Sequence, residues 1–127
     1  MKKLMVLALA AFAVFAFTGV AAQKVKKPVT FEFNFADFPK ETEFYLVGGF
    51  QGWATKVPKY KMTKKAGTTY TLTVDIKQGQ HQYKYWAPGG GWIIQDMGKY
   101  KDKIISPTPE AFVSDGFGGK NATLTVK

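Results

Sequence analysis

The sequence contains neither cysteine nor arginine. Without cysteine it forms no disulfide framework, so the folded domain has to rely on its apolar core. Without arginine it lacks the planar donor fork that binds phosphate or guanine in a bidentate way. All 18 basic residues are therefore lysines, and the formal net charge is +9. We therefore expect no specific nucleic-acid binding. The favoured role of the scattered lysines is to keep the protein soluble, and the weaker alternative is that they attract acidic polymers or an anionic membrane surface.

Groups that carry catalysis or bind metals are also scarce. His81 is the only histidine, so the chain has no His/Cys set for a metal cluster or a nucleophile relay. The nine acidic residues are scattered, and no pair stands out for acid and base catalysis. The glycine-rich segments 88–92 and 116–119 lack the following helix and the lysine and hydroxyl spacing of a phosphate loop. The sequence predicts no enzymatic activity, no catalytic residue, no metal site and no cofactor.

Residues 1–22 have the pattern of a secretory signal peptide. Lys2 and Lys3 precede an apolar run over residues 4–17, and small residues follow, with cleavage expected after Ala22. A lasting membrane anchor is the disfavoured alternative, because the run is short for a membrane span and no cysteine is present for lipid attachment. We expect a secreted or periplasmic protein whose mature chain keeps 16 lysines and nine acidic residues.

After a polar lead-in at residues 23–28, the segment 29–127 has the pattern of one all-β domain. Apolar residues alternate with polar ones in residues 31–35, 69–76 and 122–126, as strands with one buried face require. Clusters of glycine, proline, serine and asparagine separate the strands, and no helical period stands out. The length suits a single core, so the pattern predicts a β-sandwich or a small barrel.

The same alternation assigns two faces to the strand at residues 80–86. Two tyrosines take the buried positions, which turns the residues between and beside them toward solvent. These outward residues are Gln82, Lys84 and Trp86. Trp53 lies in a glycine-rich turn and Trp92 directly follows three glycines, so all three tryptophans are expected at or beside exposed positions.

Exposed indoles, amides and an ammonium group are together typical of sugar binding. An indole face stacks on the apolar C–H face of a pyranose, while amide and ammonium groups bond to hydroxyls in defined directions. The candidate residues from this reasoning are Trp53, Trp86, Trp92, Lys84, Gln82 and Asn121. The alternative is that the tryptophans fold back as loop anchors and close the ends of the sandwich.

Four segments stand in an order that is known from one family: "VGGFQGW", "GQHQYKYW", "GGGWIIQD" and "GKNATLTV". With them, residues 31–126 resemble the family 48 carbohydrate-binding module. That module is best known as the glycogen-binding domain of the AMP-activated protein kinase β subunit and as the N-terminal module of branching and debranching enzymes. The chain departs from the family pattern at Gln51, where an asparagine is usual, at Gly119, where the glycogen-binding version has a hydroxyl residue, and in a longer turn before Trp92.

The resemblance implies an immunoglobulin-like β-sandwich of the early-set type that binds α-1,4-linked glucan. It implies that Trp53 and Trp92 stack on sugar rings, and that Lys84 contacts sugar hydroxyls. Asn121 corresponds to the terminal asparagine of the family. Phe117 falls at the position of an apolar residue that lies against the sugar.

We therefore predict a secreted, non-catalytic module that binds an α-glucan polysaccharide or oligosaccharide such as glycogen or starch. The alternative is a cell-envelope module of the same fold that docks onto another protein without binding sugar. The protein partner would be a glucan-processing enzyme or an envelope protein, and no nucleic acid is expected as a partner.

Overall fold

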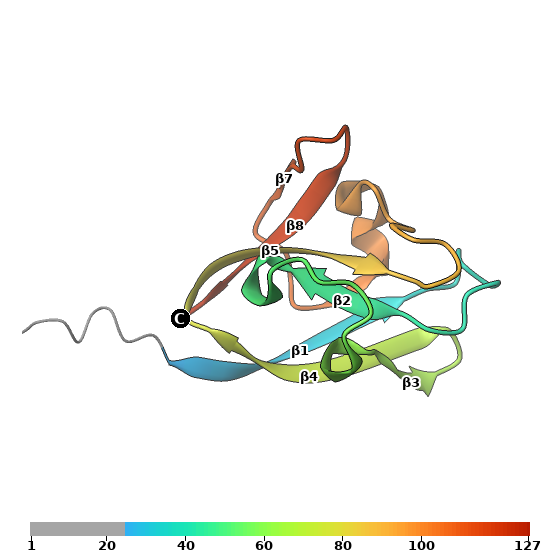
Figure 1. Ribbon diagram of the computed structural model, residues 1–127, viewed down its shortest axis with the longest axis horizontal. Helices are drawn as coiled ribbons and strands as arrows, with labels where there is room; N and C mark the ends of the chain where they lie inside the picture. Colours follow the sequence, from blue (N-terminus) through green and yellow to red (C-terminus); the bar gives the residue numbers. More distant parts are fainter. Residues whose placement is uncertain (1–24) are drawn as a thin grey trace, which may run out of the picture.

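The computed structural model describes residues 25–127 as two four-stranded antiparallel sheets that enclose the core between them (Figure 1). The first sheet has the order β3–β4–β1–β6 and the second has the order β2–β5–β8–β7. The strands are β1 (Lys26–Asn34), β2 (Tyr45–Gly48), β3 (Thr63–Ala66), β4 (Thr69–Lys77), β5 (Gly79–Trp86), β6 (Ile104–Ser106), β7 (Phe112–Ser114) and β8 (Lys120–Val126). Three short 3-10 segments join them, namely η3 (Gly49–Gln51), η4 (Pro58–Tyr60) and η5 (Met97–Lys103).

The all-β sandwich predicted from the sequence is confirmed, whereas the immunoglobulin-like type stays a prediction. The proposed signal peptide lies outside the described residues. Strand β1 begins inside the expected lead-in, because Lys26 and Lys27 pair with Lys77 and Ile76 of β4. None of the helices in residues 25–127 is long and apolar enough to cross a membrane.

The core between the sheets is rich in aromatic side chains. Alternation along β1 points Phe31 and Phe33 inward, and both are fully buried, as predicted. Opposite them, the second sheet contributes Tyr83 and Tyr85, whose rings lie 5.2 Å from Phe31 and 5.0 Å from Phe33 between centroids. Phe35 follows directly after β1 and is also buried. Since large apolar surfaces supply most of the free energy of folding, this layer holds the two sheets together.

The burial of the two core tyrosines predicts how the stability of the fold changes at alkaline pH. Burial raises the pKa of Tyr83 and that of Tyr85, and the neighbouring Tyr83 raises the Tyr85 pKa further. An unfolded tyrosine ionises near pH 10, so above that pH the folded state holds more protons and its free energy of unfolding falls as the pH rises. We expect alkaline unfolding to coincide with ionisation of these two residues, measured as tyrosinate absorbance. The double variant Tyr83→Phe, Tyr85→Phe should unfold at higher pH; an unchanged midpoint would contradict this coupling.

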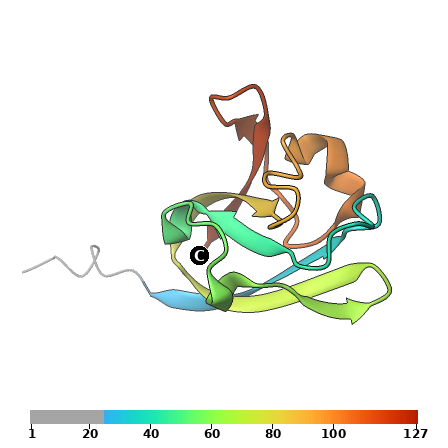
Figure 2. The ribbon, with the colours of Figure 1, turned by 45° about the vertical axis from the view of Figure 1, so that its right-hand side comes forward.

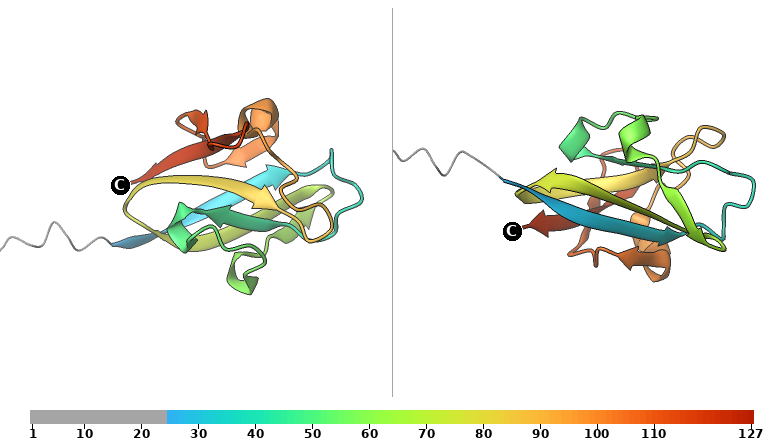
Figure 3. Two further views of the ribbon diagram at one scale, coloured as in Figure 1. Left: turned by 45° about the horizontal axis from the view of Figure 1, so that its top comes forward. Right: turned by 90° about the horizontal axis from the view of Figure 1, so that it is seen from below.

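The second sheet has another face that is turned away from the core, and this face carries the candidate site. Strands β2 and β5 pair so that Val47 lies opposite Lys84 and Tyr45 opposite Trp86. Figure 3 shows the layers from two further directions, and Figure 2 shows the β7–β8 hairpin and η5 rising together on one side of the molecule. The turn after β2, the segment between β5 and η5, and the β7–β8 loop together surround this outer face.

Candidate functional site

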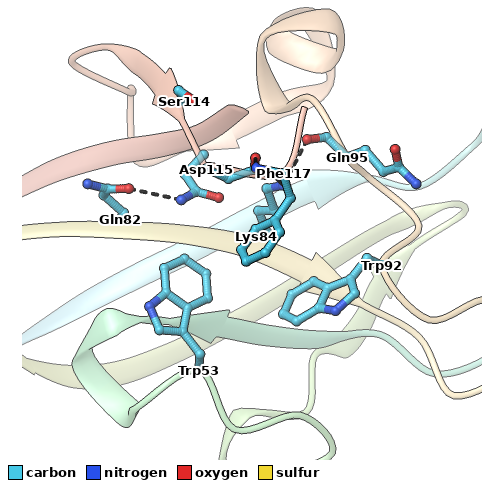
Figure 4. A pocket seen from close by; sticks show the side chains of 9 residues that line it. Trp53, Gln82, Lys84, Trp92, Gln95, Ser114, Asp115 and Phe117 are labelled. Carbon is cyan, nitrogen blue, oxygen red and sulfur yellow. Dashed lines mark hydrogen bonds and ion pairs between the residues drawn. The ribbon is translucent and has the colours of Figure 1, made fainter. Parts of the chain in front are cut away.

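A cleft of about 630 Å³ lies on the outer face of the second sheet (Figure 4). Its walls contain six of the seven site residues predicted from the sequence: Trp53, Gln82, Lys84, Trp92, Phe117 and Asn121. Gln95, Ser114 and Asp115 complete the lining and were not predicted. The structure therefore brings residues from four separate segments of the chain around one opening.

Trp53 lies at one wall because the turn after β2 is built to present it. The turn bends through Gly52 at φ 71° and Trp53 itself at φ 60°, a left-handed conformation that costs a non-glycine residue about 1–2 kcal/mol. The Gln51 side chain braces this turn, since its Oε1 accepts from Gly48 N at 3.3 Å and its Nε2 donates to Ala54 O at 2.7 Å. Trp53 is left 37% exposed. Gln51, the departure from the family pattern, thus holds the turn.

Trp92 lies beside Trp53 in the lining of the cleft and follows a tight glycine turn. Ala87 and Gly91 exchange backbone hydrogen bonds of 2.9 and 2.6 Å, and Gly91 has φ 69°, which favours glycine. Trp92 is 40% exposed. Its ring centroid lies 6.4 Å from that of Trp53, and the two ring planes are inclined by 61°. The indoles therefore form two inclined, partly open faces, and neither closes an end of the sandwich as a fully buried anchor.

Lys84 points to the cleft side of β5, as the alternation predicted, but its expected exposure to solvent is wrong. Only 7% of its side chain is exposed. Its Nζ donates to Gln95 O at 2.8 Å and forms an ion pair with Asp115 Oδ2. The period of a strand gives the side on which a residue lies, whereas the segments that cover it come from elsewhere in the chain.

Asp115 is the acidic partner that sequence reasoning missed. Its Oδ2 binds Lys84, and its Oδ1 accepts from Phe117 N at 2.6 Å and Gly119 N at 3.0 Å. The hydrogen bond from Lys84, and then that from Phe117 N, lowers the Asp115 pKa to about 2, so its carboxylate stays charged at neutral pH. The turn sequence "SDGFGG" was a signal for such a loop-closing aspartate, because aspartate side chains commonly accept from backbone N–H groups two residues on.

An amide pair lines the cleft beside Lys84. Asn121 is buried, and its Nδ2 donates to Gln82 Oε1 at 2.9 Å, while Gln82 is exposed. Asn121 Oδ1 has no hydrogen-bond partner among the described residues. These amides place polar atoms next to the indoles, as hydroxyl recognition requires.

Phe117 lines the cleft, whereas Trp86 does not. Phe117 stands at the tip of the β7–β8 loop on the cleft and is 94% exposed. Trp86 is half-buried, since its ring packs against Tyr45 with centroids 5.9 Å apart, and it does not line the cleft. The structure therefore does not bring Trp86 together with the other predicted site residues, and its expected place on the solvent face is only partly right.

The cleft is electrically neutral overall. Of the described residues that line it, the charged ones are Lys84 and Asp115, and these form an ion pair. The remaining lining residues are aromatic, amide or hydroxyl side chains. No three histidine, cysteine, aspartate or glutamate side chains in residues 25–127 lie together as metal ligands. The large positive charge of the chain is therefore carried outside this site.

Comparison of the chain with protein-family models and with curated proteins finds no match.

Proposed function

We propose that the protein is a non-catalytic module that binds an uncharged glucan, of the α-1,4-linked type, in the cleft that Trp53 and Trp92 line side by side. The observation that carries the proposal is the pair of partly exposed indoles set at 61° beside an amide pair. An indole offers its negative face to the C–H groups of a sugar ring, and the inclined pair suits a chain whose successive rings turn relative to each other. The amides of Gln82 and Asn121 supply directional partners for hydroxyls.

The neutral lining favours an uncharged ligand over an acidic polymer. Recognition of an acidic polymer needs unpaired cationic groups at the contact surface, whereas the one lysine of the cleft is paired with Asp115. We expect modest affinity, because sugar hydroxyls exchange bonds with water for bonds with protein and only the difference remains. The N-terminal sequence pattern adds the proposal that binding takes place in the periplasm or outside the cell.

The test is affinity electrophoresis in gels that contain glycogen, run at low and at high salt. We expect glycogen to retard the protein equally at both salt concentrations, because no unpaired charge of the cleft takes part. Heparin, an acidic polysaccharide, serves as the matched control, and any retardation by it should disappear at high salt. A mobility that glycogen leaves unchanged would refute glucan binding, and glycogen binding that disappears at high salt would refute the neutral contact.

The second candidate function is docking onto a glucan-processing enzyme or an envelope protein, and Phe117 is the observation that favours it. A phenylalanine that is 94% exposed at a loop tip is suited to fill a pocket of a partner protein. In this case the protein should recover a stoichiometric partner from an envelope extract, the Phe117→Ala variant should lose that partner, and glycogen should not compete.

A further inference from the structure

We propose that Lys84 is a positioning residue that fixes the two loops on either side of the cleft, instead of a residue that contacts the ligand. The inference rests on the proposed function for the role of the cleft. It rests on this structure for the role of Lys84, because the lysine joins a strand to both loops. Its Nζ binds Gln95 O, three residues after Trp92, and Asp115 Oδ2, two residues before Phe117. Figure 4 shows Lys84 between Asp115, Gln95 and the aromatic rim.

The bonding capacity of the ammonium group supports this role. A lysine ammonium has three N–H donors, and acceptors of the chain itself, Gln95 O and Asp115 Oδ2, engage two of them. The side chain is 7% exposed, and that of Asp115 is 12% exposed. A ligand hydroxyl could take only the third N–H, and the burial of the side chain restricts access to it. The two internal contacts are the ones that compensate the buried charge, whose loss would be costly.

The two loops also touch each other at this point. Gln95 O accepts a second hydrogen bond, from Lys120 N at 2.9 Å, while within the β7–β8 loop Asp115 N donates to Gly119 O at 3.1 Å. A Cβ added at Gly119 would lie 1.9 Å from Gln95 O and 2.8 Å from Asp115 Oδ2. Only glycine allows the β7–β8 loop to approach the Trp92 segment this closely, which is the physical reason for the absence of a hydroxyl residue at position 119.

The clamp formed by Lys84, Asp115 and the Gln95 carbonyl therefore sets the relative positions of Trp92 and Phe117. Strand β5 pairs with β2 on one side and with β8 on the other. The backbone of Lys84 is therefore fixed in the sheet while its side chain contacts both loops. Loss of the clamp should displace both aromatic side chains at once, even though no aromatic or amide side chain of the cleft has been changed.

The test is a double-mutant cycle on glycogen affinity with Lys84→Met, Asp115→Asn and the double variant. For a positioning role we expect each single variant to weaken binding about tenfold and the double variant to be no weaker, because both changes break one clamp. For a direct contact, Lys84→Met would weaken binding much more than Asp115→Asn and the two losses would multiply, and this result would overturn the proposal. Lys64→Met, which removes an exposed lysine on β3, is the matched control for charge.

A second readout needs no ligand. In Lys84→Met, amide hydrogen exchange should accelerate at Gly119 and Lys120, whose N–H groups donate within the clamp, and should stay unchanged along β1 and β4. Asp115→Asn should do the same, because it removes the charged acceptor of Lys84, so the proposal stays testable if Lys84→Met fails to fold. If the unaltered protein does not bind glycogen, the proposed function fails, yet exchange at these amides still tests the clamp. Unchanged exchange in both variants would overturn the positioning role.

Discussion

The double variant Trp53→Ala, Trp92→Ala is expected to lose glycogen binding almost completely while it stays folded. Both side chains are more than one third exposed, so the sandwich does not depend on them for its core. Each indole lost from a stacking contact should cost about 1–3 kcal/mol of binding free energy, through the apolar area and the ring geometry that it contributes. Affinity electrophoresis in glycogen measures the loss, and thermal unfolding confirms that the fold persists.

The matched control for the indole pair is the third tryptophan. Trp86 lies on the same sheet but packs against Tyr45 outside the cleft. Trp86→Phe keeps an aromatic ring at that contact and should leave glycogen affinity unchanged. If Trp86→Phe weakened binding as much as Trp53→Ala does, the assignment of the ligand to this cleft would be wrong.

The fold was predictable from the sequence because period-two alternation has a direct physical meaning. Residues such as Phe31, Phe33, Val74 and Ile76 sit two apart in β1 and β4, and in both strands they face the core. Strands β6 and β7, at three residues each, are too short to show a period. Segment η5 depends on Asp96, whose Oδ1 accepts from Gly98 N, and it bends at Tyr100, so no helical pattern could reveal it.

The sequence predicted which residues line the candidate site better than it predicted their burial and contacts. Alternation placed Lys84 on the correct side of β5, but its burial depends on Asp115, which is 31 residues away along the chain. Alternation also placed Trp86 on the outer face, where Tyr45 from a paired strand covers it. A strand pattern contains no information on which loops fold over a face, so the clamp became visible only in three dimensions.

The largest expected loss of stability comes from Phe35→Ala. Phe35 is 2% exposed, and its ring stacks on Phe44 with centroids 3.8 Å apart and an interplanar angle of 11°. It also meets Tyr70 and Tyr85 edge-on at 5.6 and 5.3 Å. Truncation would remove these contacts and leave a cavity where both sheets meet, at a cost of about 3–5 kcal/mol in the free energy of unfolding. Urea unfolding measures this cost as a lower midpoint with an unchanged slope.

Phe117→Ala is the control for Phe35→Ala, because it makes the same substitution at a ring that is 94% exposed. Its free energy of unfolding should change by about 0.5 kcal/mol or less, as for other surface positions. Comparable losses in the two variants would mean that the aromatic layer does not determine stability. We expect a wide difference, because a chain without cysteine has no disulfide to limit its unfolded state, and the loss expected at Phe35 is a large share of the roughly 5–15 kcal/mol that keeps a domain folded.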